Sequence, residues 1–299
     1  MKSCKIVFFG NERLSTGYKP SGAPTLQRLI DAGFSVAAVV ASHEMAVSRK
    51  KRELEVEHIA KQNNIPVLLP NKVKDIEQQL KDFAADIGIL VAFGQMIPES
   101  IINIFPHGII NIHPSLLPRY RGPIPIEQAI LDGANETGVS IMGLVKKMDA
   151  GPIFDQARVT LVGNESKQDL TEKLHKLGAD LVIRSLPSIL DGSAKSKSQN
   201  ESEATYCQLL HKSDGVIDKQ KPAIQLEREI RAFQEWPKSR ANIFGKDVII
   251  KSAHVATQKN EKDLFLECGQ NSLLKIDQLV GPSGKQMSGT DFIKGYNKP

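Results

Sequence analysis

The sequence predicts an α/β domain with a mostly parallel sheet, followed by a small β-barrel domain. In the first half of the 299 residues, continuous apolar segments alternate with amphipathic ones, which is typical of a parallel sheet covered by helices on both faces. After residue 205, short apolar segments recur at regular spacing, which is typical of a small barrel. We therefore predict a first domain at 1–190, a linker at 191–204 and a second domain at 205–299.

The elements of the first domain follow from hydrophobic periodicity. Val73, Ile76, Leu80 and Phe83, for example, share one face of a predicted helix. Strands are expected at 5–10, 35–41, 65–70, 86–94, 108–114 and 138–145, and helices at 53–64, 73–85, 98–105, 125–134 and 164–192. Ligands of such a sheet bind beyond the carboxyl ends of its strands.

The segment 193–206 is small and polar throughout, "SAKSKSQNESEATY", so its composition is that of a linker. A helix is expected at 221–233, and short strands at 241–245, 247–256, 263–269 and 272–280.

Composition limits the class of protein. The net charge of +5 is mild, and from Thr205 to Pro299 there are 15 Lys and Arg against 11 Asp and Glu. This surplus suits a polyanionic partner, although a slightly basic soluble domain explains it equally well. No apolar run approaches the roughly 18 residues of a membrane span. Three widely spaced cysteines form no disulfide or zinc pattern, which favours a reducing cytoplasm.

Several common sites are absent from the sequence. The turn after the first predicted strand, "FFGNERLSTG", separates Gly10 from Gly17 too far for a dinucleotide-binding loop. There is no Walker loop, no His-x-x-x-His metal pair and no Gly-x-Ser-x-Gly elbow. A covalent nucleophile is therefore not indicated, and direct transfer between two bound substrates is favoured.

The segment "NIHPSLLPRYRG" at 111–122 carries the first candidate residues. Asn111 and His113 are two apart on a predicted strand, so their side chains project from the same face at its carboxyl end. Pro114 holds His113 in an extended conformation. A histidine in an apolar strand is often a satisfied structural residue, but the amide on the same face suggests a site.

Asp149 is the third candidate, in "KKMDAGPIF" just past the predicted strand 138–145. If that strand neighbours the one carrying His113, the carboxylate reaches the same crevice and stabilises the imidazolium form. Such a pair suits stabilisation of a developing oxyanion and proton transfer near neutral pH. The structural alternative is that Asp149 only shapes its turn.

"NIHPSLLPRYRG" followed by "MDAGPI" resembles the folate-dependent formyltransferases, and the resemblance extends over essentially the full chain. It implies a Rossmann-like formyltransferase domain followed by an OB-like barrel. It also implies 10-formyltetrahydrofolate as donor and the amine of methionyl initiator tRNA as acceptor, with a monomeric enzyme and no metal. Asn111, His113 and Asp149 would be catalytic. Ser115, Leu116, Leu117 and Pro118 would bind the folate, whose pterin would rest partly on backbone at 91–96.

The resemblance also implies a tRNA-binding loop after the second strand, where "SRKKRE" has Arg49, Lys50, Lys51 and Arg52 in a row. The chain departs from the family in the insertion "NERLSTGYKPSGAPT" and in "RGPIPIEQAI". These differences leave a nucleotide-linked amino sugar open as the acceptor. Water as acceptor and a non-catalytic RNA-binding relative are further alternatives. The chain ends without a dehydrogenase module, which argues against the first, and the intact Asn, His and Asp set argues against the second.

Overall fold

The computed structural model describes residues 4–11, 22–42 and 54–296. Its contacts divide the chain into two compact units, which we describe separately. The first comprises Met1–Pro125, Glu136–Thr160 and Leu170–Cys207, and the second Ile126–Asn135, Leu161–Asp169 and Gln208–Pro299.

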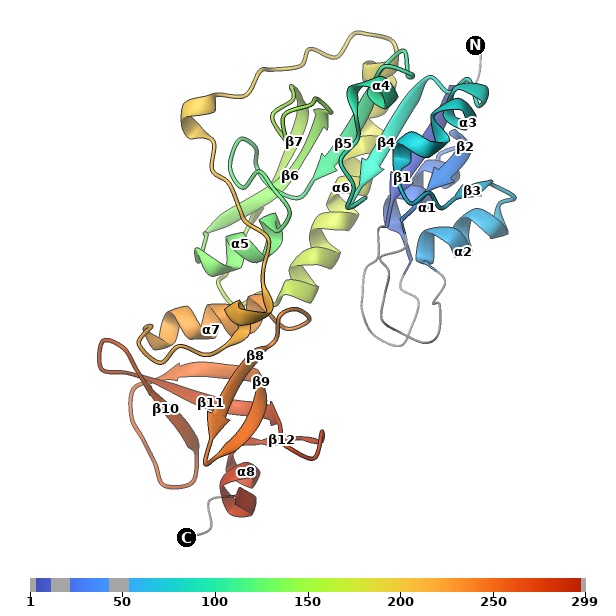
Figure 1. Cartoon of the computed structure of the whole chain (residues 1–299). Helices are drawn as coiled ribbons and strands as arrows, with labels where there is room; N and C mark the ends of the chain where they lie inside the picture. Colours follow the sequence, from blue (N-terminus) through green and yellow to red (C-terminus); the bar gives the residue numbers. More distant parts are fainter. Residues whose placement is uncertain (1–3, 12–21, 43–53, 297–299) are drawn as a thin grey trace. The chain divides into compact units, whose positions relative to one another are not determined.

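The described residues of the first unit form a seven-stranded sheet with the order β3-β2-β1-β4-β5-β6-β7 (Figure 1). Strands β1 to β5 pair in parallel, whereas β6 is antiparallel to both β5 and β7. The strands are β1 (Lys5–Gly10), β2 (Ser35–Val40), β3 (Val67–Leu68), β4 (Ile87–Val91), β5 (Ile109–His113), β6 (Glu136–Gly143) and β7 (Ile153–Thr160). The predicted mostly parallel α/β sheet is therefore confirmed, with β6 as the exception in direction.

Helices cover both faces of this sheet because its central strands are apolar on both sides. On one face, α3 and α4 pack with Val7, Phe9, Leu90 and Ile109. On the other, α6 approaches so closely that a Cβ on its Gly178 would lie 2.7 Å from the side chain of Ile112. The helices of the first unit are α1 (Pro24–Asp31), α2 (Glu55–Gln62), η1 (Val73–Ile76), α3 (Glu77–Asp82), α4 (Glu99–Ile102) and most of α6 (Lys167–Leu190), whereas α5 (Pro125–Leu131) belongs almost entirely to the second unit.

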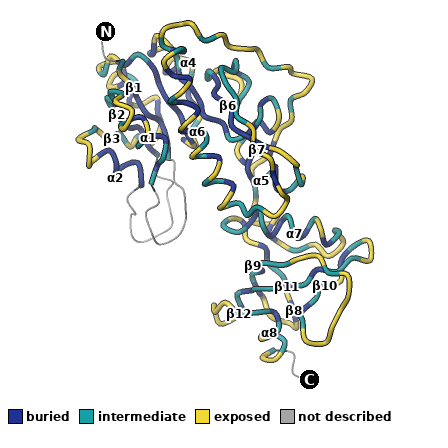
Figure 2. Tube along the Cα trace, turned by 180° about the vertical axis from the view of Figure 1, so that it is seen from behind, coloured by how far each residue is buried: buried dark blue, intermediate teal, exposed yellow. Residues whose placement is uncertain are grey.

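Burial follows the same layering. Figure 2 shows the strands of the sheet largely as dark blue, with exposed residues gathered on the outer faces of helices and in loops. None of the helices in the described ranges is long and apolar enough to cross a membrane.

The polar segment after α6, residues 193–206, is attached to the rest of the first unit by backbone hydrogen bonds. Lys197 forms a two-way backbone bridge with Ile153, and Tyr206 bridges Arg121. A single turn, η2 (Glu201–Glu203), interrupts it. The composition of the segment did not reveal these attachments.

The second unit is a curled antiparallel sheet with the order β10-β11-β9-β8, with β12 also paired to β11. Its core includes Leu226 and Ile230 of α7 and Phe292 of α8. Its main elements are η3 (Lys212–Gly215), α7 (Ala223–Ala232), β8 (Ser239–Ile243), β9 (Lys246–Ala256), β10 (Leu264–Cys268), β11 (Ser272–Val280), β12 (Gln286–Ser288) and α8 (Gly289–Tyr296). The predicted small barrel-like domain is confirmed as this half-barrel.

Candidate active site

Asn111 and His113 lie on β5, as predicted, and their side chains share one face of the sheet. Both are buried, with 7% and 4% of their surface exposed. The face that carries them also carries Ile109, which packs under α3 and α4, whereas Ile112 faces α6. His113 is the last residue of β5, so the pair lies at the carboxyl end of a parallel strand, where ligands of such sheets bind.

The orientation of the His113 ring is fixed by a backbone carbonyl. Nε2 of His113 lies 2.9 Å from the carbonyl oxygen of Tyr120. A carbonyl only accepts, so Nε2 carries a proton and donates it. Tyr120 has a positive φ of 60°, in the left-handed region that non-glycine residues rarely adopt. The remaining ring nitrogen, Nδ1, is therefore the one available to a reactant.

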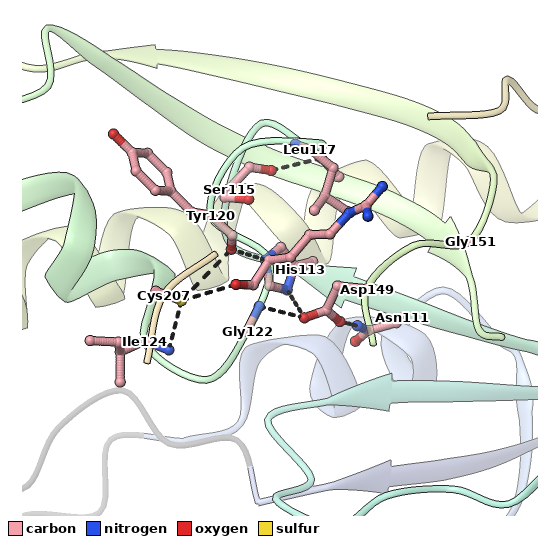
Figure 3. A network of polar contacts seen from close by, with 12 residues as sticks. Asn111, His113, Ser115, Leu117, Tyr120, Gly122, Ile124, Asp149, Gly151 and Cys207 are labelled. Atoms are coloured by element: carbon pink, nitrogen blue, oxygen red, sulfur yellow. Dashed lines mark hydrogen bonds and ion pairs between the residues drawn. The ribbon is translucent and has the colours of Figure 1, made fainter. Parts of the chain in front are cut away.

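Asp149 completes the cluster from the loop that connects β6 and β7 (Figure 3). Its Oδ1 accepts a hydrogen bond from Nδ2 of Asn111 at 3.4 Å, and its Oδ2 lies 3.8 Å from Nδ1 of His113. The backbone N–H of Gly122 donates to Oδ2 at 2.8 Å. The carboxylate is largely buried, with 14% of the side chain exposed. The three predicted residues thus converge on one point.

Asp149 reaches this position by a different route from the one expected. β6 does neighbour β5, the condition on which the expectation depended, but it runs antiparallel, so Gly143 at its end pairs with Ile110 near the start of β5. The end of β6 therefore lies away from His113, and the following loop must return to the site. Asp149 has a positive φ of 47° in that loop, and apolar periodicity gave no sign of the strand direction.

Gly122 is the residue whose backbone holds the carboxylate, and any side chain at this position would be strained. Its φ of +119° is one that L side chains rarely adopt, and a Cβ would lie 2.5 Å from the carbonyl oxygen of Cys207. Cys207 is itself buried, and its Sγ accepts a hydrogen bond from the backbone N–H of Ile124. This part of the site is therefore closely packed.

The predicted folate-binding residues form the loop that leaves β5. Ser115 is fully buried and its hydroxyl donates to the carbonyl of Arg119 at 2.6 Å. Leu117 is also buried, and its N–H donates to Oγ of Ser140 on β6. Leu116, Leu117 and Pro118 line a cavity of about 420 Å³. Their role in folate binding stays a prediction.

A larger cavity of about 810 Å³ lies where the loop after β4 meets α4. Gln95, Met96 and Ile97 line it, together with Lys72, Lys74 and Lys146. Its lining includes the end of the segment 91–96, which the sequence indicated for the pterin, and Lys146 precedes Asp149 by three residues. The volume is within the range of ligand pockets.

Some predicted features cannot be placed. Arg49, Lys50, Lys51 and Arg52, and most of the insertion after Gly10, lie outside the described residues. Within the described residues, no group of three or more His, Cys, Asp or Glu side chains could hold a metal ion.

The sequence did not indicate the backbone groups of the site. The carbonyl of Tyr120 and the N–H of Gly122 fix His113 and Asp149. Both belong to "RYRG", where only the glycine offered a signal, because glycine is the usual residue at a positive φ with close backbone contact.

The chain matches two family descriptions. Residues 5–186 match "Formyl transferase" and residues 209–297 match "Formyl transferase, C-terminal domain". Together with the α/β sheet and the polar cluster at the end of β5, these matches define the class. The chain belongs to the formyl transferase family and is a formyltransferase enzyme, which confirms the resemblance inferred from its motifs.

Among curated relatives, the chain is 35% identical to the methionyl-tRNA formyltransferase of Enterococcus faecalis, over 98% of this chain and 96% of that protein. It is 33% identical to the methionyl-tRNA formyltransferase of Coxiella burnetii with the same coverage. A solved N-formyltransferase from Helicobacter canadensis, in complex with folinic acid and dTDP-3-aminofucose, is similar in fold. Its TM-score is 0.68 at 18% identity, over 92% of this chain and 99% of that one.

Proposed function

We propose that this enzyme transfers a formyl group from 10-formyltetrahydrofolate to the amino group of methionyl initiator tRNA. The observation that carries the chemistry is the convergence of Asn111, His113 and Asp149 on one point. The acceptor rests on the similarity to methionyl-tRNA formyltransferases, which covers 98% of the chain.

In the proposed reaction, the amine attacks the formyl carbon directly. A carbon–nitrogen bond forms to the amine while the bond from the formyl carbon to N10 of the folate breaks. The proton lost by the amine ends on N10. The formyl oxygen becomes negative in the intermediate, so hydrogen-bond donors aimed at it lower the barrier.

Each cluster residue has a role in this reaction that its contacts support. His113 is anchored through Nε2, so protonated Nδ1 donates to the formyl oxygen. Asn111 directs one N–H of Nδ2 toward Asp149, and the other is available to the same oxygen. Asp149 stabilises the imidazolium and accepts the amine's proton through water.

The cavity of about 810 Å³ beside Gln95–Ile97 suits the folate donor. Its apolar residues provide contact area for a pterin ring, and backbone groups beside it provide hydrogen bonds. The loop at 115–118, which is bonded to β6 through Ser140, keeps its proposed role as a further part of the folate site.

Two basic regions are candidates for binding the tRNA. One is the run Arg49, Lys50, Lys51 and Arg52, whose charges suit contacts with phosphates. The other is the C-terminal segment 205–299, which carries most of the chain's positive surplus. Exposed Lys212, Lys238 and Lys246 belong to it.

An acceptor comparison tests the proposal. Purified full-length protein and 10-formyltetrahydrofolate are incubated separately with methionyl initiator tRNA, with a dTDP-linked amino sugar and without an acceptor. We expect formyl-methionyl-tRNA at a rate at least 100-fold above the other two reactions. Faster formylation of the sugar would identify an amino-sugar enzyme, and rapid donor hydrolysis without acceptor would identify a hydrolase. Salt-dependent tRNA binding with no transfer would indicate a non-catalytic relative.

A further inference from the structure

Gln199 lies in the polar segment after α6, 50 residues beyond Asp149 in sequence, yet it contacts the backbone of the Asp149 loop. Its Nε2 donates to the carbonyl oxygen of Asp149 at 2.8 Å and to that of Gly151 at 2.7 Å. These two carbonyls flank the turn that presents the carboxylate. The amide of Gln199 therefore connects the two ends of this turn through their backbone carbonyls.

The direction of this amide is set by a buried arginine. Arg121 has no exposed surface, and its Nε and Nη2 donate to Oε1 of Gln199 at 3.0 and 2.8 Å. A guanidinium offers donors only, so the oxygen of Gln199 must face it and the NH2 must face the two carbonyls. Both N–H donors and the oxygen of Gln199 are thus engaged.

A second contact supports the same loop. Glu201 forms ion pairs with Nη2 of Arg121 at 2.9 Å and with Nζ of Lys147 at 2.6 Å. The hydrogen bonds from Arg121 and Lys147 lower the pKa of Glu201 to about 2. Lys147 precedes Asp149 by two residues, so Arg121 is connected to the Asp149 loop through Glu201 as well as through Gln199.

Arg121 itself stands between the two residues that fix the reacting side chains. Tyr120 accepts the hydrogen bond from His113, and Gly122 donates one to Asp149. The segment Tyr120–Gly122 therefore orients His113 directly. It holds Asp149 in two ways, at the carboxylate through Gly122 and at the backbone through Arg121 and Gln199. Asp149 holds a positive φ of 47°, which aspartate adopts more readily than most residues but still at some cost, and these contacts help to hold it.

We propose that Gln199 is a positioning residue for formyl transfer, which acts by holding the Asp149 loop so that the carboxylate faces Asn111 and His113. This inference rests on the proposed role of Asp149. It extends the active site to a segment that composition alone describes as a linker.

Two substitutions separate positioning from simple attachment of the segment. Gln199→Ala removes all four hydrogen bonds. Gln199→Glu keeps oxygen acceptors for Arg121 but replaces the NH2 with an oxygen that faces two carbonyl oxygens. Attachment alone predicts normal turnover for Gln199→Glu. Positioning predicts that both variants lower kcat at least 10-fold, with KM for both substrates changed less than 3-fold.

A double-variant cycle tests whether the effect passes through Asp149. We expect Gln199→Ala combined with Asp149→Asn to be no slower than Asp149→Asn alone, because residues that act as one unit are not additive. Gln79→Ala is the matched control, since Gln79 is exposed on α3. Additive losses, or a Gln199→Glu enzyme with wild-type kcat, would overturn the proposal.

Hydrogen exchange decides the same question without any turnover. The N–H of Gly122 is bonded to the Asp149 carboxylate, so displacement of the loop exposes it. Gln199→Ala should accelerate exchange at Gly122 at least 10-fold, and Gln79→Ala should not. Unchanged exchange contradicts the inference even if the protein formylates no tRNA, whereas absent transfer with accelerated exchange contradicts only the proposed function.

Discussion

Asp149→Asn is the most informative perturbation of the site, because it removes one charge and keeps the shape of the side chain. The carboxylate lies 3.8 Å from Nδ1 of His113. At an effective dielectric constant of about 20, opposite charges at this distance attract by about 4 kcal/mol. In the variant, the NH2 of the asparagine must face either the N–H of Gly122 or Nδ2 of Asn111. Both of these groups are donors, so one hydrogen bond is lost and two donors face each other.

These losses raise the free energy of the transition state, in which both the imidazolium and the developing oxyanion are charged. A loss of about 3–4 kcal/mol corresponds to a rate reduction of about 10²–10³-fold. We therefore expect kcat to fall by that factor, with KM for donor and tRNA nearly unchanged, as measured by steady-state formylation of methionyl-tRNA.

The control is Asp180→Asn, which removes an exposed carboxylate, 59% accessible, that pairs with Arg28 on the surface. It should retain the wild-type rate, since exposed ion pairs contribute little. A folded Asp149→Asn enzyme with more than a tenth of the wild-type kcat would refute the assignment of Asp149 to the reaction.

Three further variants test neighbouring features. His113→Ala removes the donor of Nδ1 and should lower kcat by about two orders of magnitude or more, measured in the same assay. Gly122→Ala forces a Cβ to within 2.5 Å of the Cys207 carbonyl at a φ of +119°, and urea denaturation should show a loss of about 1–3 kcal/mol. Desolvation lowers the pKa of His175 in α6 from 6.5 to about 4, so its stabilising contribution is complete above pH 6.5. That contribution is lost as the pH falls toward 4, by up to about 3 kcal/mol, and His175→Gln should flatten the stability profile across this interval.

Each of these variants has its own control. Near-normal turnover in His113→Ala would remove that residue from the mechanism. Gly163→Ala has a positive φ but open space around it, so it separates backbone strain from the steric clash at Gly122. His107 is exposed, and His107→Gln should leave the pH profile of stability as in the wild type. An unchanged profile in His175→Gln would show that His175 titrates normally in the folded protein.

The central strands could be predicted from sequence because they are buried on both faces and therefore apolar throughout. β7 (Ile153–Thr160) was missed because it mixes charged and apolar residues, "IFDQARVT". The antiparallel direction of β6 was also missed, since apolar runs do not encode direction. Helix α1 was missed because its first two residues, Pro24 and Thr25, lie inside the segment interpreted as a polar insertion.

The site was predictable where its residues stand at recognisable places relative to predicted strands. Asn111 and His113 were recognised from their spacing of two on one strand, and Asp149 from its place after the next strand. The partner of Arg121 was not recognisable, because Gln199 lies 78 residues further along the chain. A tertiary contact between two polar residues at that separation leaves no periodic signal in a single sequence.

The attachment of the polar segment determines how the protein can be divided. The match to the family's first description ends at residue 186, which invites a truncation at that point. Such a fragment would lack Gln199, Glu201, Tyr206 and Cys207, and so would leave the guanidinium of Arg121 without its acceptors. A protease that cut between 192 and 199 would have a related effect, because it would turn an intramolecular attachment into a weaker intermolecular one. The shortest fragment that keeps this attachment therefore extends to residue 207.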